Sequence, residues 1–143
     1  MSHLEITVMK RLPALLLILA LASGSAAATS TDAVALQMTS LSVGHEVAAD
    51  DPAVTRTRTL LDQVSARYGD DATAIFAACR RYLGHLHDAA QIKATPLELL
   101  SALATSGKAG QPINDVLLAY VAARKAAAQR THAQAMALLA GGT

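Results

Sequence analysis

Aromatic residues, cysteine and net charge are all scarce in this chain of 143 residues. With no tryptophan, one phenylalanine and three tyrosines, any core must be built from aliphatic side chains and alanine. A single cysteine excludes an intramolecular disulfide, so stability has to come from packing. The formal net charge of +1 argues against a nucleic-acid partner, because nucleic-acid-binding domains usually carry a clearly basic surface.

Motifs of common active sites are lacking as well. The sequence contains no Gly-x-Ser-x-Gly, His-Glu-x-x-His, phosphate-binding loop or Cys-x-x-Cys-His. Glu46 and Glu98 are the only glutamates after residue 28, which makes a carboxylate pair for glycosidic chemistry unexpected. We therefore predict that the protein is not an enzyme and holds no cofactor.

The N-terminus shows the three parts of a secretory signal peptide. A Lys-Arg pair is followed by an almost unbroken run of Leu, Ile and Ala (residues 12–22) and then by small residues that end at Ala28. This pattern predicts cleavage after Ala28. The apolar run is shorter than the roughly 20 residues that cross a bilayer, so we expect no permanent membrane span after cleavage. Met9 is an alternative start, because every part of the signal follows it.

Cleavage at this point divides the chain into a signal peptide, residues 1–28, and a single domain, residues 29–143. In that domain apolar residues recur at intervals of three and four, and no segment shows sustained alternation. The fold class is therefore predicted to be all-α, a compact array of four to five helices. The predicted location is periplasmic or secreted.

The boundaries of the predicted helices follow from capping residues. Thr95-Pro96-Leu97-Glu98 is a capping box, and Asp-Pro and Gly-Asp-Asp sequences separate the earlier helices. The expected helices cover about residues 32–49, 52–68, 72–86, 95–105 and 112–139. In the first, Asp32 is the predicted N-cap, and Leu41 and His45 are placed on the inner stripe.

The last of these helices looks too long for the rest of the bundle. Residues 112–139 would extend about 42 Å as one helix. Either this helix ends early or its C-terminal half projects from the domain. An apolar stripe continues through that half, which favours contact with a protein partner; its members are Ala128, His132, Ala135, Met136 and Leu139.

Arginines on two consecutive helices form a second candidate binding surface. Arg56 and Arg58 lie on the helix predicted over residues 52–68, and Arg80 lies on the next one. They predict either an ordinary solvated surface paired with aspartates or a face that docks an acidic protein or lipid headgroups.

Cysteine, histidine and methionine raise further alternatives. Cys79 lies on an apolar helical stripe and is predicted to be buried, with an intermolecular disulfide as the alternative. His85 and His87 could chelate a metal only if the helix ended at Gly84, because positions i and i+2 of a helix face apart. A methionine near the start of the domain (Met38) and a histidine near its end (His132) resemble the ligand layout of soluble four-helix b-type cytochromes.

Function by protein binding is the interpretation that these observations favour. We expect the protein to be an accessory component of a cell-envelope assembly, such as a secretion or conjugation machine. It would bind a protein partner, and the complex they form can be membrane-associated. An immunity-type inhibitor of a toxin or envelope enzyme is the first alternative. A haem- or metal-binding four-helix protein is the second.

Overall fold

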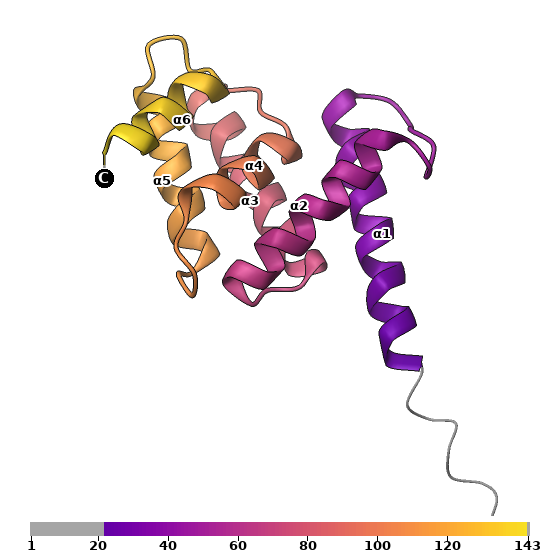
Figure 1. Cartoon of the computed structure of the whole chain (residues 1–143). Coiled ribbons are helices and arrows are strands. Elements are labelled where there is room, and N and C mark those ends of the chain that lie inside the picture. Colours follow the sequence, from indigo (N-terminus) through magenta and orange to yellow (C-terminus); the bar gives the residue numbers. More distant parts are fainter. Residues whose placement is uncertain (1–21, 143) are drawn as a thin grey trace, which may run out of the picture.

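The computed structural model of the chain describes residues 22–142, which are all-helical (Figure 1). Six helices make up this part: α1 (Ala22–Val43), α2 (Pro52–Tyr68), α3 (Ala72–Ala90), α4 (Pro96–Ser106), α5 (Ile113–Ala126) and α6 (His132–Gly141). The all-α class is confirmed. Most of the predicted signal peptide lies outside the described residues.

The middle helices begin where their capping residues predict, although α3 runs to Ala90, four residues beyond its predicted end. The Asp51 carboxylate accepts a hydrogen bond from the Ala53 amide at 2.7 Å, and Gly69 ends α2 with a φ of 82°. Asp71 caps α3 in the same way. The capping box of α4 is complete, because the Thr95 amide donates to Glu98 while the Glu98 amide donates to the Thr95 hydroxyl. These bonds satisfy amides that the first helical turn leaves without partners.

The first helix differs from its prediction at both ends. It already includes Ala22, the first residue described, so Asp32 lies inside α1 and forms an ion pair with Arg58 of α2 instead of capping. It stops at Val43, because Gly44 turns the chain with a φ of 82°. Leu41 is 53 % exposed and His45 is also exposed, so their assignment to the inner stripe was wrong.

Two threonines meet inside the contact between α1 and α2. Thr39 and Thr57 are buried, and their hydroxyl oxygens are 2.7 Å apart. Each hydroxyl also lies within hydrogen-bonding distance of a carbonyl four residues earlier in its own helix, that of Ala35 at 2.8 Å and that of Ala53 at 3.0 Å. The two helices are thus tied by a polar contact within an otherwise apolar interface.

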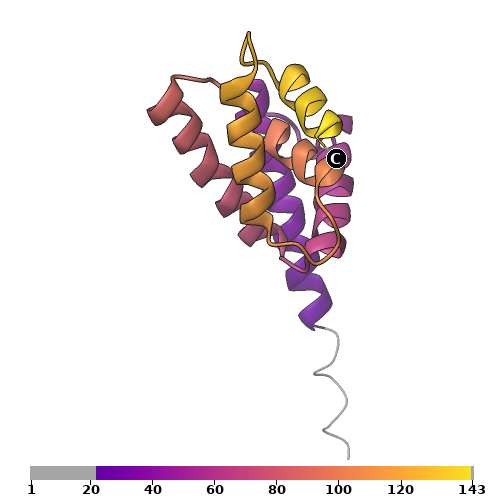
Figure 2. The same cartoon turned by 90° about the vertical axis from the view of Figure 1, so that its left-hand side faces the viewer.

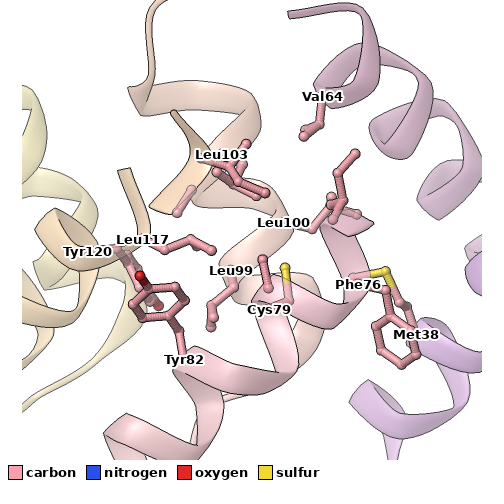
Figure 3. Packing of buried hydrophobic residues seen from close by; sticks show 14 of the residues in the cluster. Met38, Val64, Phe76, Cys79, Tyr82, Leu99, Leu100, Leu103, Leu117 and Tyr120 are labelled. Atoms are coloured by element: carbon pink, nitrogen blue, oxygen red, sulfur yellow. The ribbon is translucent and has the colours of Figure 1, made fainter. Parts of the chain in front are cut away.

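Helix α4 is the centre of the fold, since it contacts each of the other five helices. Leu99, Leu100 and Leu103 are fully buried, and they point in different directions toward α2, α3 and α5 (Figure 3). The apolar stripe predicted for α3 faces them, and Cys79 is seen beside Leu99 in this view. Aliphatic side chains therefore fill most of the core, as the scarcity of aromatics requires.

The predicted last helix is divided into two. Helix α5 ends at Ala126, and α6 starts at His132 after a turn in which Arg130 has a φ of 55°. Thr131 caps α6 by accepting a hydrogen bond from the Gln134 amide. Helix α6 then folds back beside α5 and also packs on α4 (Figures 1 and 2). The prediction of a projecting segment was wrong, and the alternative of an early helix end is confirmed.

Candidate functional site

The strongest concentration of polar contacts surrounds Arg124, which is only 4 % exposed. Its guanidinium donates to three groups from three parts of the chain: the Arg130 carbonyl at 2.5 Å, the Tyr120 hydroxyl at 2.7 Å and the Lys93 carbonyl at 3.1 Å. Its Nη1 is also 3.3 Å from a carboxylate oxygen of Glu98. A buried charge is tolerated when it is paired and hydrogen-bonded; Arg124 is paired with Glu98, and each of its three guanidinium nitrogens donates a hydrogen bond.

Two further side chains extend this network across neighbouring helices. The Glu98 oxygen that pairs with Arg124 also accepts the Thr95 amide, so the capping box of α4 and the ion pair share one carboxylate. The Tyr120 hydroxyl lies 2.8 Å from Nδ1 of His132, the first residue of α6. We call Glu98, Tyr120, Arg124 and His132 the Arg124 network; it joins α4, α5 and α6.

The turn between α5 and α6 is held from both sides. Arg124 binds the carbonyl of Arg130, while the Arg130 side chain donates to the Ala90 carbonyl at the end of α3 at 2.9 Å. A positive φ is uncommon for a residue with a side chain, and these contacts offset its cost. These hydrogen bonds therefore hold the turn in place, and the turn fixes the position of α6.

Burial changes the proton affinities in the network. It raises the pKa of Tyr120 above its ordinary value of 10.0, and the Arg124 guanidinium only partly opposes this. Burial also lowers the pKa of His132 below 6.5; the Glu98 carboxylate opposes this, whereas the Arg124 charge adds to it. At neutral pH the phenol accordingly keeps its proton, and the imidazole is uncharged.

Two surface depressions lie on opposite sides of α6. The larger, of about 340 Å³, is lined by alanines of the α5–α6 turn (Ala126, Ala127 and Ala128) and by Gln134, Ala137 and Leu138 of α6. The smaller, of about 130 Å³, is lined by Thr105 and Ser106 at the end of α4 and by Met136, Leu139 and Ala140 of α6. Both are mostly apolar. Leu138, beside the larger one, is 49 % exposed.

The C-terminal residues predicted to bind a partner lie on or next to α6, and they have different structural roles. Ala128 is exposed and lines the larger depression. Met136 and Leu139 line the smaller one, although both also pack against the protein's own core. His132 is bonded to Tyr120, and Ala135 is fully buried. The stripe thus serves the domain's own core as well as its surface, and partner binding by these residues stays a prediction.

The arginines predicted as a second surface also have separate roles. Arg58 pairs with Asp32 across α1 and α2. Arg80 is exposed and its guanidinium lies 5.8 Å from the centre of the Phe76 ring, on its own helix. Arg56 is exposed on α2. Of the three, Arg58 is therefore committed to holding α1 against α2.

The cysteine and the remaining histidines are placed as follows. Cys79 is fully buried, which confirms its predicted position, and burial raises the pKa of its thiol to about 12. Helix α3 continues past Gly84 to Ala90, so His85 and His87 lie on one helix and the condition for chelation is not met. Within residues 22–142, no group of three or more His, Cys, Asp or Glu side chains is arranged to hold a metal.

The methionine and histidine of the cytochrome-like layout lie far apart. Met38 is fully buried on α1 beside Phe76 (Figure 3), whereas His132 is on α6, at the opposite side of the molecule (Figure 1). The fold therefore does not bring this pair of side chains to one site.

Sequence analysis missed the Arg124 network, although one signal for it was present. Ile113, Leu117 and Tyr120 form the buried stripe of α5, and Arg124 follows at the next position of that stripe. A charged residue on an apolar stripe requires a partner of opposite charge. Glu98, whose place in a capping box was predicted, was a candidate for that partner.

Comparison with known proteins adds no relative. The chain matches no protein family, and neither the curated proteins nor the solved structures give a significant match. Among the helices of residues 22–142, none combines the length and apolar character of a membrane span.

Proposed function

We propose that the protein is exported and acts by binding another protein, as an accessory component of a cell-envelope assembly such as a secretion or conjugation machine. The observation that carries this proposal is the pair of depressions on either side of α6. A binding surface with exposed apolar side chains and a fixed backbone suits a protein partner, because little ordering entropy is lost when the partner docks.

The Arg124 network supports this role by fixing the backbone that carries both depressions. It binds the turn at Arg130 and the start of α6 at His132. The larger depression is lined by Ala126, Ala127 and Ala128, which precede Arg130, and by α6 residues that follow His132. A partner would contact small side chains and Leu138, and small side chains let a second helix approach closely.

Export is supported by the sequence and is compatible with the position of α1. The first turns of α1 extend beyond the other helices (Figures 1 and 2). The described core residues of this helix begin at Val34, after the predicted cleavage at Ala28. Cleavage there would leave Thr29, Ser30, Thr31 and Asp32 at the new helix start, and these residue types are favoured as N-caps.

We expect the exported protein to begin at Thr29 or an adjacent residue. Mass spectrometry of the intact protein, recovered from the cell envelope or the medium of the producing cell, gives its N-terminus directly. A version that starts at Met9 should be exported and cleaved identically, because the signal follows that residue. Recovery of a chain that still begins at Met1 or Met9 would contradict the export part of the proposal.

Site-specific photo-crosslinking in the producing cell tests the binding part. We expect a photoreactive residue at Ala137, in the larger depression, to give a discrete protein adduct. The same residue at Leu41 should give none, since Leu41 is also exposed but lies on α1 at the opposite side of the molecule. Leu138→Arg should remove the Ala137 adduct, whereas Leu41→Arg should leave it unchanged.

The identity of the adduct separates the proposed function from its alternative. A component of an envelope complex supports the accessory role, whereas a single soluble toxin or enzyme would favour an immunity-type inhibitor. Equal crosslinking from Ala137 and Leu41, or none from Ala137, would contradict partner binding at α6.

A further inference from the structure

The contact between Tyr120 and His132 gives the phenol hydrogen an acceptor in only one protonation state of the imidazole. Arg124 Nη1 donates to the Tyr120 oxygen at 2.7 Å, and arginine has no lone pair with which to accept a bond in return. Tyr120 therefore has one hydrogen to give, and its acceptor is Nδ1 of His132 at 2.8 Å. When the phenol hydrogen is directed at Nδ1, that nitrogen is unprotonated and the imidazole hydrogen is on Nε2.

Protonation of His132 would place two donors against one another. The new hydrogen on Nδ1 would point at the Tyr120 oxygen, which already accepts from Arg124, and the phenol hydrogen would lose its acceptor. His132 is also the first residue of α6, where the helix dipole is positive and disfavours a cation. Both effects oppose a charged imidazole in the docked position.

The charges around His132 come from each element that packs against α6. Helix α5 supplies Tyr120 and the Arg124 guanidinium, and α4 supplies the Glu98 carboxylate. Glu98 alone favours a charged imidazole, but it is already paired with Arg124 at 3.3 Å. Arg130, two residues before His132, adds a further positive charge, and its guanidinium is bonded to the end of α3.

We propose that His132 is a pH-sensitive latch, which holds α6 against α5 while its imidazole is neutral and releases α6 when the imidazole is protonated. Release would remove one wall from each of the two depressions, because residues of α6 line both. The latch is a property of the chain alone, and it holds or fails whether or not a partner binds at α6.

The direction of the pH dependence follows from the pKa of His132 while α6 is docked. The pKa of His132 is lowered below 6.5 when α6 is docked, and it returns to its ordinary value when α6 is released. Docking is therefore fully stabilised above pH 6.5 and weakens as the pH falls from 6.5 toward the docked pKa. Each pH unit between the two pKa values changes the docking equilibrium by up to about tenfold.

Hydrogen exchange of the α6 amides measures this equilibrium. After correction for intrinsic exchange rates, we expect protection of residues 133–141 to fall between about pH 7.5 and about pH 5, by up to about tenfold per pH unit below 6.5, while the α2 and α3 amides keep theirs. His132→Asn should abolish the fall, because its side-chain oxygen accepts from Tyr120 and does not titrate. Equal loss of protection in His132→Asn and the unchanged protein would overturn the proposal.

His85 offers a matched control. Its ring lies 5.4 Å from that of Tyr82, much as the ring of His132 lies 5.7 Å from that of Tyr120, but His85 is exposed. His85→Asn should leave the pH dependence of α6 intact. If His132→Asn fails to fold, an NMR titration of the unchanged protein decides: a His132 pKa at or above 6.5 overturns the latch, whereas a lower value with parallel shifts in the α6 amides supports it.

Discussion

Arg124→Met is expected to lower the free energy of unfolding by about 3–5 kcal/mol, the usual cost of removing one partner from a buried ion pair. Methionine fills a similar volume but leaves the Glu98 carboxylate without its counter-charge, and the Tyr120 hydroxyl and two backbone carbonyls without the Arg124 donor. Because small domains are stable by only about 5–15 kcal/mol, this loss is a large part of the total. Urea denaturation followed by circular dichroism measures it.

Two comparisons make the Arg124 result specific. Lys125→Met removes the same charge from the next residue, which is exposed, and should change the stability by less than about 0.5 kcal/mol. Arg124→Lys should remain destabilising, because one ammonium group cannot reach the four partners that the planar guanidinium binds. If Arg124→Met and Lys125→Met lowered the free energy of unfolding by equally small amounts, the network would not hold the C-terminal helices.

Cys79 is expected to react about 1000-fold more slowly in the folded protein than after unfolding, as judged from the fraction of thiolate at about pH 8. The thiolate is the reactive form, and burial raises the pKa of this thiol from 9.0 to about 12. The side chain is also fully buried, which slows the reaction further. A colorimetric thiol reagent at about pH 8, with and without denaturant, gives the two rates.

A cysteine at an exposed position calibrates the measurement. Ala119→Cys in a Cys79→Ala background should react in the folded state at nearly its unfolded rate, since residue 119 is exposed on α5. Fast labelling of Cys79 in the folded protein, or a disulfide-linked dimer on a non-reducing gel, would contradict its inert role. The second result would instead support an intermolecular disulfide.

Local signals predicted the middle of the fold correctly. The caps at Asp51, Asp71 and Thr95 are short-range interactions between residues no more than three apart, so they are visible in the sequence. The buried stripe of α3 was also predicted, because its apolar spacing belongs to one helix. Such features do not depend on where the other helices lie.

The ends of the fold depend on contacts that sequence spacing does not reveal. Asp32 was a reasonable cap, but α1 continues upstream of it and Asp32 pairs instead with Arg58 of another helix. The break after Ala126 follows no glycine or proline; it depends on Arg124 binding the Arg130 carbonyl and on Arg130 binding the end of α3. Alanine-rich sequence favours a continuous helix, and here tertiary contacts override that preference.

The threonine pair between α1 and α2 has two hydroxyl hydrogens for three oxygen contacts, so one contact always lacks a hydrogen. Whichever hydroxyl donates across the interface gives up its own helix carbonyl, and the two choices exchange without moving a heavy atom. A slide of α1 by one turn would separate the two hydroxyls, and each would then donate only to the carbonyl of its own helix. The bond between Thr39 and Thr57 therefore forms only in the observed register of the two helices.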